Sequence, residues 1–145
     1  MARSFSFSKI ARVGAALGAI AALSVFAYVA DAEDDAGAQI KVVSSNALPN
    51  VPGKTLTTVV VNYAPGGKSP AHHHSGSVYA YVLSGQIRSE NSATGPAKVY
   101  KAGEGFFEPP GSEHSVSENA SATEPASLLA IFVADDGAKL TTFDK

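Results

Sequence analysis

The chain has 145 residues, enough for one domain, and 45% of them are hydrophobic against 17% charged, which favours a folded protein over a disordered one. A formal net charge of −2 gives no electrostatic basis for binding nucleic acid. Because the chain has no cysteine, it can form no disulfide, thiolate metal site, catalytic thiol or lipoprotein anchor.

The first 32 residues contain the three parts of a secretory signal peptide. Arg3, Lys9 and Arg12 form a basic start, residues 13–30 are uncharged, and Ala30-Asp31-Ala32 supplies the small residues of a cleavage site. We therefore predict an exported protein, periplasmic or secreted. The alternative is an uncleaved inner-membrane anchor, because the uncharged stretch approaches the ~20 residues that a membrane-spanning helix needs.

The remaining chain is predicted to consist of short strands separated by turns. Residues 33–39 are acidic and rich in Gly and Ala, and we interpret them as a flexible lead-in to a domain over residues 40–145. The later runs are rich in β-branched and aromatic residues, lack a helical period, and are bounded by Gly, Pro, Asn and Ser. Strands are expected at residues 40–43, 55–63, 78–83, 86–90, 97–101, 105–108, 114–117, 128–134 and 139–143. This pattern predicts an all-β sandwich or barrel.

Four histidines are the candidate chemical groups of the chain: His72, His73, His74 and His114. In an extended segment side chains alternate between two faces, so His72 and His74 point one way and His73 the other. His114 opens a predicted strand after a tight turn, where it could supply a third ligand. Imidazole nitrogens are typical ligands of zinc, copper, iron and nickel. A surface patch of polar histidines is the alternative interpretation.

The spacing of these histidines resembles the two motifs of the cupin superfamily. The first motif, G-x5-H-x-H-x3,4-E-x6-G, is matched from Gly66 to Gly85, except that Val78 stands where the motif has Glu. The second, G-x5-P-x-G-x2-H-x3-N, is matched from Gly103 to His114, and Asn119 comes one position late. The resemblance implies a single-domain jelly-roll β-barrel with its core over residues 55–134.

The resemblance also implies that His72, His74 and His114 bind a divalent metal. A valine at position 78 cannot act as a ligand, so the site would hold three neutral imidazoles and leave the full +2 charge on the ion, which favours anionic ligands. Iron or manganese is the favoured metal, with zinc, nickel and copper as alternatives. Homodimers are common in the family, and an apolar stripe that includes Tyr79 and Tyr81 would suit such an interface.

Side-chain alternation names further interior positions. We expect Val78, Ala80, Val82 and Phe106 to form apolar walls of the barrel interior. Continuing the same alternation beyond Gly85 places Gln86 and Arg88 inside as well. Glu108 shares a face with Phe106 and is the candidate catalytic residue, either as a general base or as a distant fourth ligand. The alternative is that Glu108 is a solvated acid at the end of a strand.

Two functions from different classes fit these expectations. The first is a non-haem metal-dependent oxygenase that acts on a small anionic molecule. The second is a non-catalytic periplasmic module that binds or senses a metal or a small ligand. A metal-free scaffold is a third interpretation, and it predicts that chelators leave the melting temperature unchanged. Contact with a membrane is expected only through an uncleaved N-terminal segment.

Overall fold

The computed structural model describes residues 37–145, and every regular element in this part of the chain is a strand. The predicted signal segment, residues 1–32, and most of the predicted lead-in lie outside the described residues. Within them, no helix is long and apolar enough to cross a membrane. The strands are β1 (Ala38–Ala47), β2 (Lys54–Tyr63), β3 (Lys68–Ser69), β4 (His72–His74), β5 (Ser77–Ser84), β6 (Gln86–Asn91), β7 (Gly95–Lys101), β8 (Gly105–Glu108), β9 (Glu113–Asn119), β10 (Ala126–Asp135) and β11 (Thr141–Phe143).

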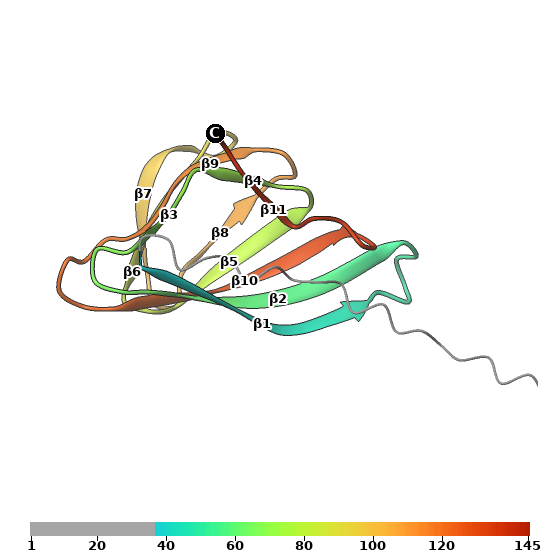
Figure 1. Ribbon diagram of the computed structural model, residues 1–145, viewed down its shortest axis with the longest axis horizontal. Coiled ribbons are helices and arrows are strands. Elements are labelled where there is room, and N and C mark those ends of the chain that lie inside the picture. The colour runs from blue at the N-terminus through green and yellow to red at the C-terminus, as the bar shows by residue number, and fades with distance from the viewer. Residues whose placement is uncertain (1–36) are drawn as a thin grey trace, which may run out of the picture.

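These strands form two antiparallel sheets that close on each other as a jelly-roll barrel (Figure 1). The first sheet has the order β1-β2-β10-β5-β8, and we call it the apolar sheet. The second has the order β11-β4-β9-β6-β7, with β3 also paired to β9, and we call it the histidine sheet. The predicted all-β class is confirmed. The first strand begins at Ala38, two residues before the predicted position, and β11 is confined to residues 141–143.

The two sheets bury side chains of different polarity. The apolar sheet buries mainly hydrocarbon, from strands in which buried and more exposed positions alternate as in β10. Its buried hydrophobic residues are Ala38, Val59, Val61, Tyr63, Val78, Ala80, Val82, Phe106, Ala126, Leu128, Ala130, Phe132 and Ala134. In the histidine sheet Ile87 is the one buried hydrophobic residue among the described strands. The other buried residues of that sheet are His72, His74, Ser89, Asn91, His114, Ser117 and Asn119.

The predicted inward orientation of Gln86 and Arg88 is wrong. Both side chains are exposed, whereas Ile87 between them is fully buried. Gly85 adopts a φ of +69°, and the chain passes there from β5 of the apolar sheet to β6 of the histidine sheet. Because the turn reverses which face of the chain points inward, the alternation counted along β5 does not continue into β6. Arg88 instead forms an exposed ion pair with Glu118 at 2.8 Å.

An apolar stripe lies on the outer face of the apolar sheet, as the alternation predicts. Tyr79, Tyr81 and Leu83 project outward from β5, and Phe107 of the neighbouring β8 joins them. Each of these side chains is exposed. This outer face remains our predicted contact surface for a second copy of the chain.

Gly85 gives a first testable expectation, because it is constrained in two ways. Its φ is one that L-residues rarely adopt, and a Cβ there would lie 2.6 Å from the Pro125 carbonyl oxygen and 2.8 Å from Ala126 Cβ. Gly53 is the matched control, since its φ is also positive (+81°) but a Cβ would meet nothing within 4 Å. We expect Gly53→Ala to lower the unfolding free energy by about 1 kcal/mol through backbone strain alone. Gly85→Ala should cost roughly 2–3 kcal/mol because strain and overpacking add. Urea unfolding compares the two, and equal losses would contradict the steric part of the argument.

Candidate metal centre

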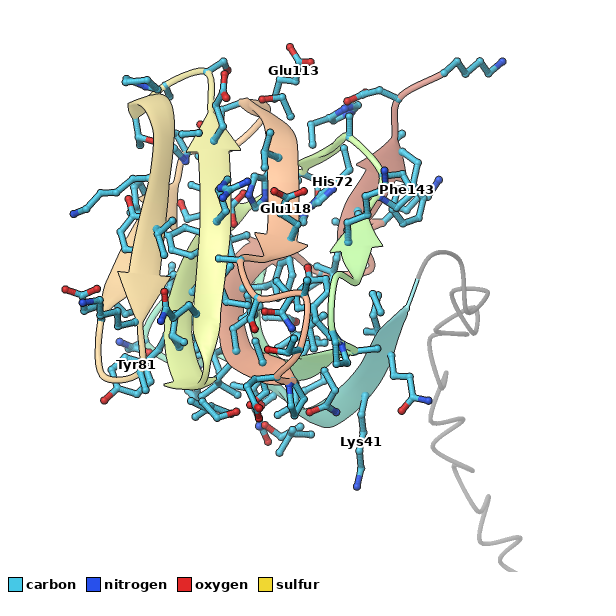
Figure 2. All side chains as sticks on the ribbon, turned by 90° about the vertical axis from the view of Figure 1, so that its left-hand side faces the viewer. Lys41, His72, Tyr81, Glu113, Glu118 and Phe143 are labelled. Carbon is cyan, nitrogen blue, oxygen red and sulfur yellow. The ribbon has the colours of Figure 1, made fainter. Side chains whose placement is uncertain are left out.

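The structure brings together the three histidines that the sequence singled out. His72 and His74 alternate inward from β4, and His114 of β9 lies directly opposite His72 in the antiparallel register. One ring nitrogen from each of the three lies within 4.8 Å of the others. All three residues are buried, whereas His73 points outward and contacts Asp144 at 2.9 Å. Figure 2 shows His72 beside Phe143 of β11 and distant from Tyr81 of the apolar stripe.

Each imidazole is oriented by a contact to one of its two ring nitrogens. His72 Nδ1 lies 2.7 Å from the Pro70 carbonyl oxygen, and His74 Nδ1 lies 3.2 Å from the Leu140 carbonyl oxygen. If these nitrogens donate, the Nε2 lone pairs of both rings are free. His114 uses the other nitrogen, since its Nε2 lies 2.9 Å from Ser89 Oγ. Fixing the far nitrogen in this way is how proteins orient histidine ligands of metals.

His114 Nδ1 is left without a hydrogen bond inside the barrel. It is the one buried side-chain nitrogen or oxygen without such a partner in residues 37–145. Glu108 Oε2 lies only 2.8 Å away, but the two atoms do not meet at hydrogen-bonding angles. The contact with Glu108 offsets part of the roughly 1–3 kcal/mol that a buried polar atom without a hydrogen bond costs. A metal ion bound by this nitrogen would remove that cost.

Glu108 is part of the same cluster, so the interpretation of it as a solvated acid is wrong. It is 2% exposed at the end of β8. Its Oε2 lies 3.7 Å from His74 Nε2 as well as 2.8 Å from His114 Nδ1. Burial alone would raise the pKa of Glu108, but contact with His114 and the nearby imidazoles together hold it below its usual value. Glu108 is therefore ionised at neutral pH.

The environment keeps at least two of the histidines in the state that a metal requires. Burial lowers the pKa of His72 to about 4, since a charged imidazole loses its hydration inside the barrel. Burial also lowers the pKa of His74, although the negative charge of Glu108 opposes this. Both rings are neutral at pH 7, with lone pairs available for a cation. Three imidazole nitrogens and one carboxylate oxygen fit a first-row divalent metal.

Several groups at the site were not identified from the sequence. Ser89 and Asn91 contact His114 and Glu108 from β6, where alternation counted from β5 gives the wrong face. Leu140, Thr141 and Phe143 reach it from the C-terminal segment: Thr141 Oγ1 is 3.2 Å from His74 Nδ1, and the Phe143 and His72 ring centroids are 5.9 Å apart. Of these groups, only Ser89 and Asn91 could be recognised from a local pattern, because small polar side chains occur at alternate positions of β6. The β11–β4 contact joins residues about 70 positions apart, so no local pattern predicts it.

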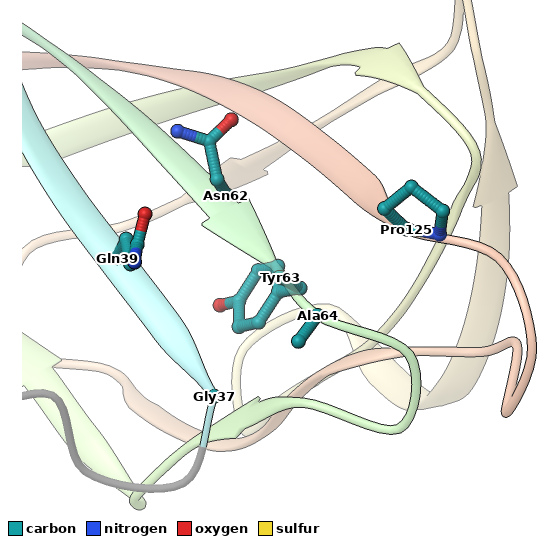
Figure 3. Close-up of a pocket in the computed structure, with 6 residues that line it drawn as sticks. All are labelled: Gly37, Gln39, Asn62, Tyr63, Ala64 and Pro125. Atoms are coloured by element: carbon teal, nitrogen blue, oxygen red, sulfur yellow. The ribbon is translucent and has the colours of Figure 1, made fainter.

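A separate recess of about 380 Å³ lies at the ends of β1 and β2 and contains none of the histidines (Figure 3). It is lined by Gly37, Gln39, Asn62, Tyr63, Ala64 and Pro125. The Tyr63 hydroxyl is engaged elsewhere, with Ser69 and Ser117 at 2.9 Å each. Burial raises the pKa of Tyr63, so this phenol stays neutral. The recess therefore offers no reactive group, and the histidine cluster is the candidate site.

Fold and site together define a small jelly-roll protein with a buried histidine cluster that could hold a metal ion. The chain belongs to the cupin domain family, whose sequence model matches residues 59–132. No curated protein matches it in sequence.

Solved structures show the same fold. A cupin-like protein from Thermotoga maritima is 20% identical, with a TM-score of 0.55 over 74% of this chain and 75% of that one. Oxalate oxidase is 21% identical, with a TM-score of 0.58 over 75% and 56% of the two chains. The DMSP lyase DddQ from Ruegeria pomeroyi is 18% identical, with a TM-score of 0.59 over 74% and 51%. This chain thus spans about half the length of the oxidase and the lyase, and at such identities the likeness concerns the fold alone.

Proposed function

We propose that this cupin is a metal-dependent enzyme of the non-haem oxygenase type, with its metal bound by His72, His74 and His114. The observation that carries the proposal is the buried cluster itself, in which one ring nitrogen from each of three oriented imidazoles lies within 4.8 Å of the others and one of these nitrogens, His114 Nδ1, has no hydrogen bond. Iron or manganese is the proposed metal. Bound there, such an ion would supply Lewis acidity and one-electron chemistry.

The substrate that this site favours is a small anion. A divalent ion with three neutral ligands and one carboxylate keeps a net positive charge, which attracts anionic groups. Two buried aromatic rings border the cluster, Phe132 at 5.1 Å from His74 and Phe106 at 6.0 Å from His114 between ring centroids. These rings exclude water and so strengthen that attraction. Oxalate and glycolate, named for the structurally similar oxidase, are small carboxylates of this kind.

We also propose where the protein acts, how two copies pair and what Glu108 does. The protein acts outside the cytoplasm after export directed by residues 1–32, whose basic start and apolar stretch support it. Two copies pair through the apolar stripe of β5 and β8, because exposed apolar side chains gathered on one sheet face favour association. Glu108 is the carboxylate in contact with the histidines, which makes it the candidate for moving a proton or for binding the metal.

The test is metal content, measured by elemental analysis on the untagged full chain. We expect about one divalent metal per chain, and its loss in His114→Ala. His73→Ala is the matched control, since this neighbouring histidine points outward and should leave the metal in place. Full occupancy in His114→Ala, or an empty wild-type protein after reconstitution, would contradict the proposal. Oxygen uptake with oxalate then separates an oxygen-consuming enzyme from a binding module, which would hold the metal without turnover.

A further inference from the structure

The acidic ligand that the first cupin motif would supply is absent from its usual position. Val78 occupies that position on β5, is 1% exposed, and points into the barrel. A valine offers no lone pair, so β5 contributes nothing to the metal centre. The interior next to Val78 nevertheless contains a carboxylate.

That carboxylate comes from the neighbouring strand. Glu108 of β8 is the direct antiparallel partner of Val78 in β5. Directly opposite residues in such a pair project to the same face, with Cβ atoms roughly 4.5–5.5 Å apart. A carboxylate on either member of the pair therefore enters the same part of the interior.

The distances around Glu108 Oε2 suit a shared metal ion. Metal–ligand bonds of roughly 2.0–2.2 Å place neighbouring donor atoms roughly 3–3.5 Å apart around one ion. Glu108 Oε2 lies 2.8 Å from His114 Nδ1 and 3.7 Å from His74 Nε2, on either side of that range. The shorter contact is not a hydrogen bond by its geometry, as is expected when both atoms point to the same metal ion.

The charge of Glu108 also calls for a cation. Among the described residues Glu108 is the one buried carboxylate, and neither Lys nor Arg is buried with it. Glu108 accepts a long hydrogen bond from the uncharged side chain of Asn91, whose Nδ2 lies 3.5 Å from Glu108 Oε2, at the limit for such a bond. A buried carboxylate is costly unless it is paired or binds a metal.

We infer that Glu108 is the fourth metal ligand, so that this chain takes its acidic ligand from β8 in place of the position on β5 now held by Val78. This inference rests on the proposed metal binding by the three histidines. It makes the centre a three-histidine, one-carboxylate site with a net charge of +1. Glu108 is then a ligand and not a general base. The rival explanation is a structural contact between Glu108 and His114 without any metal role.

The test measures the dissociation constant for Mn²⁺ and Co²⁺ by titration calorimetry on the full chain. Glu108→Val should weaken binding at least tenfold. The exchange variant, Val78→Glu with Glu108→Val, returns a carboxylate to the same space and should recover most of the affinity. Glu113→Gln is the matched control: it removes an exposed carboxylate next to His114 in sequence and should leave the constant unchanged.

The outcomes separate the two levels of the proposal. Unchanged affinity in Glu108→Val, together with lost binding in His114→Ala, would overturn the ligand role of Glu108 and leave the histidine site intact. Unchanged affinity in His114→Ala would overturn the proposed function itself. An exchange variant that is folded by circular dichroism but binds no better than Glu108→Val would also overturn the inference, because the loss would then come from packing.

Discussion

Acidification from pH 7 to pH 4 is expected to remove about 3 kcal/mol of unfolding free energy from the metal-free protein through His72 alone. The pKa of His72 is lowered from 6.5 to about 4 by burial. Between these values the unfolded chain binds a proton that the folded chain does not, so stability is present above pH 6.5 and is lost as the pH falls towards 4. A lowered pKa of His74 adds a loss of the same sign. Glu108, with a lowered carboxyl pKa, adds its loss only below about pH 4.5.

Urea unfolding at pH 7, 6, 5 and 4, after chelation, measures this dependence. His72→Gln should flatten the profile between pH 6.5 and 4, because a neutral amide cannot take up the proton. His73→Gln, which changes the neighbouring outward-facing histidine, should keep the slope of the wild-type protein. Parallel profiles for wild type and His72→Gln would show that the burial of His72 does not set the acid limit of the fold.

The sequence was sufficient to predict most of the strands and to single out the three histidines, because both depend on local patterns. The short strands β3 and β4 were not predicted. Alternating β-branched residues between Gly and Pro turns mark strands such as β2 and β10. The H-x-H spacing places His72 and His74 on one face wherever the segment is extended. The second motif then brings His114 to the neighbouring strand.

The position of Glu108 directly opposite Val78 could not be predicted, since it depends on the register between two strands. Alternation shows that Glu108 shares a face with Phe106, but not that the partner across the sheet is Val78. A shift of one residue in that pairing would move the carboxylate to the other face. In β6 the alternation counted from β5 gives the wrong buried face, because the chain crosses at Gly85 from the apolar sheet to the histidine sheet.

The division of polarity between the two sheets explains how a small barrel can hold so polar a cluster. The apolar sheet and Ile87 form the hydrophobic core. Apart from His114 Nδ1, the buried polar side-chain atoms of the histidine sheet have hydrogen-bond partners, as where Ser89 Oγ contacts His114 Nε2 and Ser117 Oγ contacts the hydroxyl of Tyr63 in β2. Apart from Glu108 of β8, the polar groups of the site therefore lie in the histidine sheet, and most of the hydrophobic core lies in the apolar sheet. Substitutions in the histidine sheet can change the site with little effect on the core.

The C-terminal segment supports the site through three separate contacts. β11 pairs antiparallel with β4, so that Phe143 lies opposite His72 and Thr141 opposite His74. The Leu140 carbonyl oxygen and Thr141 Oγ1 each lie 3.2 Å from His74 Nδ1. Asp144 contacts His73 on the outside of the strand. β4 has only three residues, so it depends on β11 and β9 for its position.

Deleting residues 139–145 is therefore expected to weaken metal binding by roughly 10–100-fold, the range found when partners that orient metal ligands are lost. His74 would lose both groups near Nδ1 and with them its fixed tautomer. The core should persist, because the residues of β11 are only partly buried and most of the hydrophobic core lies in the apolar sheet. Asp144→Ala is the matched control: it breaks only the exposed contact with His73, which contributes about 0.5 kcal/mol or less, and should leave the affinity unchanged. Calorimetric titration with Mn²⁺ measures the affinity, and thermal unfolding without metal checks the fold. A truncated protein that stays folded and binds Mn²⁺ as tightly as the full chain would show that β4 holds its histidines in place without β11.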